Sequence, residues 1–154
     1  LMHPGNFINV TGGFQSQRDR VESVMVFCVD EMLPRHRTLD IQVHIGNYEA
    51  NENVMGQCLH VTGNEFHIDI DSKQNLYNLI LTTCHEMVHV KQYSRKELKE
   101  SFPKTLWFNK EYTDGRCYPW EREAWDMQSQ LAHKYIKQHT NYTINTVKML
   151  DKRS

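Results

Sequence analysis

The residues of this chain that suggest metal chemistry are concentrated in the segment 82–90. His85, Glu86 and His89 form the pattern His-Glu-x-x-His there. In a helix, residues four apart lie one above the other, so the two imidazoles would share one face. Two imidazoles on one face suit a tetrahedral divalent ion, most often zinc. Glu86 is turned by one residue and could contact a water molecule on the ion without being a ligand.

The residues around the motif have the spacing of an amphipathic helix. We place this helix over residues 73–99, with Asp71 and Ser72 supplying caps before it. The apolar positions that recur at i, i+3 and i+4 are Leu76, Leu79, Ile80, Cys84, Met87 and Val88. The alternative is two core histidines whose ring nitrogens are satisfied within the protein.

A catalytic zinc site uses three protein ligands and keeps one position open for water. The candidates for the third ligand are Glu121, Glu123, His133 and His139, which all lie on a predicted last helix. At 100° per residue, Glu121 falls inside the apolar stripe of that helix, whereas Glu123 falls on its polar, solvated face. A carboxylate directed into a core needs a strong partner, such as a metal ion. Glu121 is therefore preferred, and pairing of Glu121 with a buried arginine is the alternative.

His85-Glu86-x-x-His89 followed by Glu121-x-x-Ala124 on a later helix resembles the gluzincin metallopeptidases, most closely the small single-domain kinds. The resemblance implies that zinc is the cofactor and that His85, His89 and Glu121 are its ligands. It also implies that Glu86 is the catalytic base, which takes the proton of the attacking water and passes it to the leaving amine.

The resemblance further implies a protein or peptide substrate that lies extended along an edge strand, for which residues 65–71 are the candidate. Some gluzincins place an aspartate four residues after the ligand glutamate to support the first histidine. Trp125 stands at that position here, so the residue that orients His85 is not identified. The candidates for stabilising the oxyanion are Tyr112, Arg116 and Tyr118.

The pattern of the whole chain predicts an α+β fold with a zincin-like core at about residues 14–139. We expect one metallopeptidase domain over residues 1–154, in which 140–154 is a polar tail. The core would hold an N-terminal helix, a small and mostly antiparallel sheet, the His-Glu-x-x-His helix and the later glutamate-bearing helix. The predicted elements are an irregular start at 1–13, a helix at 14–33, strands at 39–45, 58–62 and 65–71, a strand or hairpin arm at 106–113, a turn at Asp114-Gly115 and the last helix from Pro119 to about His139.

Composition limits the classes of partner. The net charge of −1 gives no electrostatic reason to expect nucleic acid or an anionic membrane. No apolar run approaches the roughly 20 residues that span a bilayer. The four cysteines are widely spaced, which favours reduced thiols and a cytoplasmic or otherwise intracellular protein.

Two other functions remain open. One is a non-catalytic zinc-binding interaction module, in which the metal only joins two helices; a glutamate at position 86 would then have no task as a base. The other is a SprT-like protease, which takes a later histidine as third ligand and acts near DNA. The chain has neither a basic patch nor a C-x-x-C zinc ribbon, which argues against that class.

Overall fold

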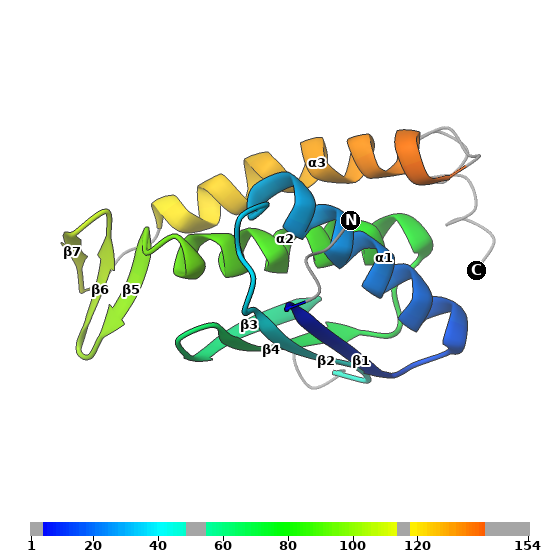
Figure 1. The fold of residues 1–154 in the computed structure, drawn as a ribbon, viewed down its shortest axis with the longest axis horizontal. Helices are drawn as coiled ribbons and strands as arrows, with labels where there is room; N and C mark the ends of the chain where they lie inside the picture. The colour runs from blue at the N-terminus through cyan, green and yellow to red at the C-terminus, as the bar shows by residue number, and fades with distance from the viewer. Residues whose placement is uncertain (1–4, 49–54, 114–117, 141–154) are drawn as a thin grey trace.

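The computed structural model describes residues 5–48, 55–113 and 118–140. They form three layers, which Figure 1 shows from the side: a four-stranded sheet, then helices α1 (Gln15–Met32) and α2 (Leu76–Ser94), then helix α3 (Pro119–His139) on top of α2. A second, three-stranded sheet projects beyond the end of α2. The expected α+β class is confirmed.

The larger sheet has the strand order β1-β2-β4-β3. Its strands are β1 (Phe7–Gly12), β2 (Asp40–Gly46), β3 (Gly56–Thr62) and β4 (Glu65–Asp71). The β1–β2 and β2–β4 pairs are parallel and only β3–β4 is antiparallel, so the expectation of a mostly antiparallel sheet is wrong for this sheet. Alternation of apolar residues is the same in both kinds of pairing, so it could not distinguish them.

Strand β1 lies in the segment 1–13, which was expected to be irregular. The expectation is wrong for residues 7–12, which pair with β2 in register from Phe7–Asp40 to Gly12–Ile45. Helix α1 connects these two parallel strands, as a crossover must. Gly12 and Gly13 have positive φ values of 79° and 59° and turn the chain from the strand into the helix.

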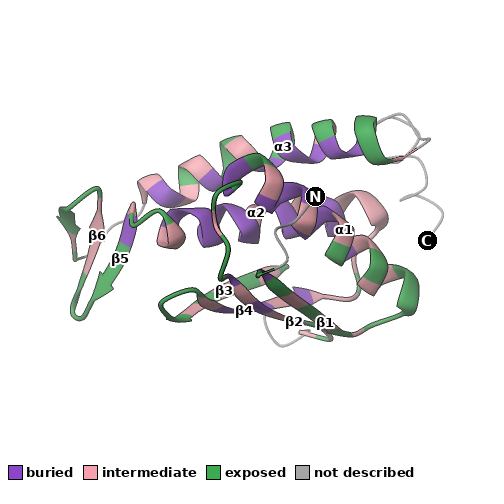
Figure 2. Cartoon of the chain, in the orientation of Figure 1, coloured by how far each residue is buried: buried purple, intermediate pink, exposed green. Residues whose placement is uncertain are grey.

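One face of the sheet carries the core, and on the other face β2 and β4 carry polar side chains. In β2 and β4, which lie close to the predicted strands 39–45 and 65–71, every second residue is buried: Ile41, Val43, Ile45, Phe66, Ile68 and Ile70. These side chains pack with the buried faces of α1, α2 and α3 in one hydrophobic cluster, and Figure 2 shows the purple faces turned toward one another. The opposite face of the sheet carries no helix among the described residues.

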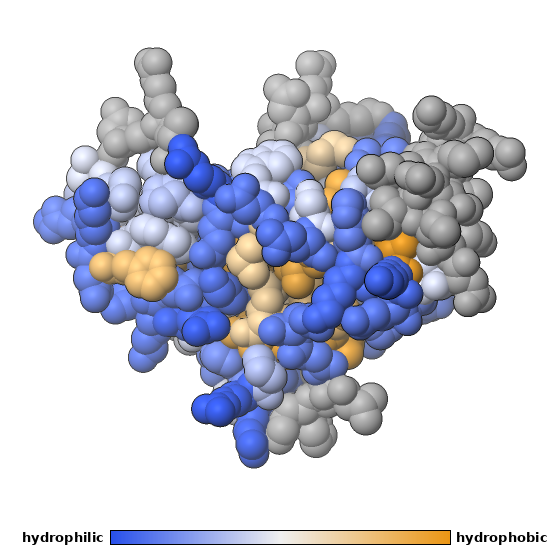
Figure 3. All heavy atoms as spheres, turned by 90° about the horizontal axis from the view of Figure 1, so that it is seen from above, coloured by the Kyte–Doolittle hydropathy of each residue, from blue (hydrophilic) through white to orange (hydrophobic). Residues whose placement is uncertain are grey.

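The helices confirm most of the predicted bounds. Helix α1 differs from its prediction by one residue at each end, and α3 begins at Pro119 and ends at His139 as predicted. The outward face of α3 is exposed, and the surface seen from that side is mainly hydrophilic (Figures 2 and 3).

Helix α2 is shorter than expected at both ends. Asn75, rather than Asp71 or Ser72, is its N-cap and accepts a 2.7 Å hydrogen bond from the Asn78 N–H. It stops at Ser94 instead of residue 99, because Lys96 takes a φ of 60° and the chain turns away.

The second sheet joins α2 to α3. It consists of the antiparallel strands β5 (Leu98–Ser101), β6 (Lys104–Trp107) and β7 (Lys110–Tyr112), which we call the arm. The prediction of a strand or hairpin near 106–113 is confirmed, but β5 was missed. The predicted turn at Asp114-Gly115 and the tail from residue 141 lie outside the described residues.

Candidate metal centre

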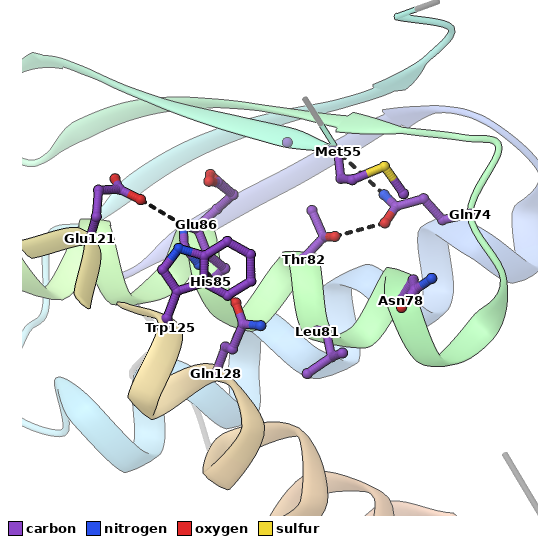
Figure 4. A pocket seen from close by; sticks show the side chains of 11 residues that line it. Met55, Gln74, Asn78, Leu81, Thr82, His85, Glu86, Glu121, Trp125 and Gln128 are labelled. Carbon is purple, nitrogen blue, oxygen red and sulfur yellow. Dashed lines mark hydrogen bonds and ion pairs between the residues drawn. The ribbon is translucent and has the colours of Figure 1, made fainter. Parts of the chain in front are cut away.

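Three side chains from two helices meet at one point, between α2 and the first turn of α3. His85 and His89 lie on successive turns of α2, and Glu121 reaches them from α3 (Figure 4 shows His85 and Glu121). The Nε2 atom of His89 is 2.9 Å from Oε1 of Glu121, and Nε2 of His85 is 3.3 Å from Oε2. Among the described residues, this is the group of three whose ligand atoms lie close enough together to hold a metal ion.

The Glu121 carboxylate is more exposed than its place in the apolar stripe suggested. Its side chain is 43% exposed, so it is not a carboxylate buried in the core. The neighbouring Trp120 is the buried residue of this turn, while Glu121 faces the open end of the site. The helix angle predicted correctly that Glu121 faces the two histidines, but it did not predict how exposed the side chain is.

Each histidine is oriented by a glutamine. The Nδ1 atom of His85 is 2.8 Å from Oε1 of Gln128, and Nδ1 of His89 is 2.8 Å from Oε1 of Gln92. Because an amide oxygen only accepts hydrogen bonds, each Nδ1 carries the ring hydrogen. The Nε2 atom of each ring faces Glu121, and in a neutral ring this nitrogen would be free to bind a metal ion, as in metal-ligating histidines.

Sequence reasoning did not assign either glutamine a role. Gln92 follows His89 by three residues, so it lies on the same side of α2. Gln128 follows Glu121 by seven residues, which is two turns along the same side of α3. These spacings were the available signal, but only the contact between α2 and α3 shows which ring each amide meets.

Gln92 is itself held by a buried polar network. Its Nε2 donates to the carbonyl oxygen of Trp120 at 2.9 Å and to Oε1 of Glu123 at 3.1 Å. Oε1 of Glu123 also accepts a 2.8 Å hydrogen bond from the buried ammonium group of Lys91. The expectation that Glu123 lies on a solvated face is therefore wrong, because α2 covers that side of the first turn of α3.

The close contact between the histidines and Glu121 shifts the pKa values of Glu121 and His89. Hydrogen bonds from His85 and His89 hold the pKa of Glu121 well below its usual range. Burial alone would lower the pKa of His89, but its hydrogen bond with Glu121 and the charge of Glu86 outweigh burial, and the pKa is raised. Both shifts follow from the close contact between the imidazoles and the carboxylate groups.

The donor set fits zinc. Two imidazole nitrogens and a carboxylate oxygen are common zinc ligands, and zinc bonds of about 2.0–2.2 Å put tetrahedral ligand atoms about 3.3 Å apart. The two nitrogen–oxygen separations of 2.9 and 3.3 Å are close to that spacing.

Glu86 follows His85 on α2 and lines the same cavity as His85 and Glu121. It is 4% exposed, and its Oε2 atom has no hydrogen-bond partner among the described residues. Burial raises the pKa of this carboxyl, and the two histidines oppose the shift. An unpaired buried carboxylate oxygen is costly, so its position is explained best by a partner such as a water molecule held at the site.

A cavity of about 380 Å³ opens at this point. It is bounded by α2, by α3 and by the start of β3, as Figure 4 shows. The lining residues are Met55, Gly56, Gln74, Asn78, Leu81, Thr82, His85, Glu86, Glu121, Trp125 and Gln128.

Gly56 is required where β3 passes over α2. A Cβ atom there would lie 2.6 Å from Cγ2 of Thr82 and 3.2 Å from Cγ of Glu86. Only a glycine lets the strand approach the helix so closely.

The strand beside the cavity is not the one expected. Strand β4 (Glu65–Asp71) pairs with β2 on one side and β3 on the other, so it has no free edge. The expectation that it is the edge strand is wrong, and β3 takes that place. The Asp71 N–H donates to the Met55 carbonyl, so the backbone groups of Gly56 point away from β4.

The other candidate ligands lie elsewhere. His133 is hydrogen-bonded to the Tyr77 hydroxyl at 2.9 Å, and His139 stacks on Tyr135. Neither belongs to the group formed with Glu121.

Of the suggested oxyanion residues, neither Tyr112 nor Tyr118 lines the cavity. Tyr112 and Tyr118 pack their rings against Trp120, with centroids 5.5 and 4.4 Å apart, and Arg116 lies outside the described residues.

The described cysteines are free thiols. Cys84, one of the apolar positions of the predicted helix, lies fully buried, with its sulfur 3.9 Å from that of Cys28. Cys117 lies outside the described residues.

Comparison with known proteins finds no similar protein. No family model, no curated protein and no solved structure matches this chain. None of the described helices combines the length and the apolar character needed to cross a membrane.

Proposed function

We propose that the chain is a zinc-dependent metallopeptidase with a zincin-like core, in which His85, His89 and Glu121 hold the metal. One observation carries the proposal. The partnerless Oε2 atom of the buried Glu86 lies beside the His-His-Glu group, at the wall of a cavity. A purely structural site would need neither the buried carboxylate nor the open space next to it.

When bound, zinc polarises the substrate carbonyl and lowers the pKa of a water molecule. Glu86 accepts a proton from that water as the oxygen bonds to the carbonyl carbon. It then donates the proton to the leaving nitrogen as the peptide bond breaks. Burial of Glu86 suits this task, because the raised pKa makes the carboxylate a better base.

The substrate is proposed to lie extended along β3. The outward backbone groups of Gly56 make no backbone hydrogen bond with the other described residues, and Gly56 lies close to Glu86, so a peptide could pair with this strand there. Main-chain pairing there would hold the scissile bond between the base and the metal ligands.

The test compares Glu86→Gln with the wild type. Glu86→Gln should bind about one zinc per chain and keep its fold but lose cleavage of a peptide library, because an amide cannot accept the proton. Glu22→Gln, at an exposed position of α1, is the matched control and should cleave normally. Full cleavage by Glu86→Gln would remove Glu86 from the mechanism. Zinc binding by a wild type that cleaves no peptide would favour the non-catalytic zinc module.

A further inference from the structure

The cavity beside Glu86 extends away from the metal ligands, along α2 toward its N-terminal end. Lining residues recur along that helix, from His85 and Glu86 through Thr82 and Leu81 to Asn78 (Figure 4). A volume of about 380 Å³ is at the small end for ligand pockets, which suits a single large side chain with its adjoining backbone.

The described charged side chains that line the cavity are all acidic and lie at its metal end. Among the described lining residues, the carboxylates are Glu86 and Glu121, both at the metal end, and no lysine or arginine is present. An acidic side chain in this cavity would therefore meet no cationic partner, and burying an unpaired charge is costly.

The middle of the cavity is apolar. Leu81 on α2 forms one wall, and Trp125 on α3, which packs edge-on against His85 with centroids 5.3 Å apart, forms another. Met55 lines the cavity from the start of β3. These walls match the hydrocarbon stem of a long side chain.

At the far end, the described lining residues are polar but uncharged. Gln74 is already bonded: its Oε1 accepts from the Thr82 hydroxyl at 2.7 Å, and its Nε2 donates to the carbonyl oxygens of Met55 and Asp71. The Asn78 carboxamide lines the cavity and makes no hydrogen bond with the other described residues. It is thus available to a ligand.

We propose that this cavity receives one long, uncharged side chain of the substrate, and that Asn78 sets the selectivity for charge. The inference rests on the proposed function and deepens it by naming the substrate class. Among the described lining residues, an ammonium group at the far end would meet no carboxylate, and a carboxylate would meet no lysine or arginine. Side chains such as leucine or glutamine carry no charge, so their burial leaves no charge unpaired. Glutamine can also form a hydrogen bond with Asn78.

The test measures binding, so it does not depend on turnover. Four peptide hydroxamates that differ in a single side chain, that of leucine, glutamine, glutamate or lysine, are titrated calorimetrically into the zinc-loaded protein. The leucine and glutamine probes should bind on the order of tenfold more tightly than the glutamate and lysine probes.

Exchanges at Asn78 should change the ranking. Asn78→Asp should raise the affinity for the lysine probe, and Asn78→Lys should raise that for the glutamate probe. The matched controls are Asn9→Asp and Asn9→Lys, which make the same changes at an exposed position of β1, on the opposite edge of the sheet. Both controls should leave the ranking unchanged.

The outcomes separate this inference from the proposed function. Equal affinity for all four probes in the wild type would overturn the inference, and so would a ranking unaltered by both exchanges at Asn78. If the four probes bind with the expected order of affinities but the protein cleaves no peptide, the proposed function is contradicted. The assignment of the cavity is then still supported.

Discussion

The Nδ1 atom of His85 lies 2.8 Å from the side-chain oxygen of Gln128, seven residues after Glu121 on the same helix. Helix α3 thus supplies both a candidate metal ligand and the group that orients another ligand. Any shift of α3 along α2 would disturb two of the three ligands together.

Replacing Gln128 should weaken zinc binding without unfolding the protein. In Gln128→Leu the His85 ring loses the acceptor that fixes its orientation, and the zinc affinity should fall about 10–100-fold. Competition with a chromophoric chelator measures this. Gln130→Leu changes an exposed glutamine of the same helix and should bind zinc normally. Equal affinity in the two variants would remove Gln128 from the site.

Glu121 and Glu123 should fail in different ways. Glu121→Ala should abolish most zinc binding and the rise in melting temperature on adding zinc, because a ligand is lost. Glu123→Ala should lower the stability of the metal-free protein by roughly 1–3 kcal/mol, because Lys91 and Gln92 lose a buried acceptor. Urea unfolding with and without chelator separates the two effects. Larger zinc loss in Glu123→Ala, His133→Ala or His139→Ala would contradict ligation by Glu121.

Gly56→Ala should impair catalysis more than metal binding. The added methyl group would collide with Thr82 and push β3 away from Glu86. Displacement of the substrate backbone should lower kcat/KM by about tenfold or more, while zinc affinity stays close to that of the wild type. The double variant Gly56→Ala/Thr82→Ser removes the colliding Cγ2 atom but keeps the hydroxyl. It should recover part of the loss, and no recovery would argue against a steric cause.

The arm should influence the metal site through Trp120. The Trp107 and Tyr112 rings pack on Trp120, with centroids 6.2 and 5.5 Å away, directly beside Glu121. Trp107→Ala should therefore loosen the first turn of α3 and reduce zinc affinity several-fold. Phe102→Ala removes an aromatic side chain from the same arm that is 99% exposed, and it should have no effect. Equal zinc affinity in both variants would contradict this coupling.

The sequence predicted what depends on a single element. The bounds of α3, the direction of Glu121 and the alternating core residues of β2 and β4 all follow from local periodicity. What it did not predict depends on contacts between elements. Glu123 is on the polar side of its own helix, yet Lys91 of α2 meets it there.

The same limit applies to the sheet. Apolar and polar residues alternate over 65–71, which was interpreted as an edge strand, but β3 pairs with that edge. The sequence of a strand does not show which strand lies beside it. Strand β1 was missed because the glycines that follow it were interpreted as an irregular start, although they turn the chain from β1 into α1.

The order of the ligands along the chain affects how the site assembles during synthesis. Glu121 follows His89 by 32 residues, and the arm lies between them. At about 5–20 residues per second, translation leaves an interval of roughly 2–6 s between the two ligands. In that interval the growing chain holds two histidines and no carboxylate ligand. The proposed peptidase therefore cannot acquire its complete metal site until the arm has been made and the first turn of α3 has docked.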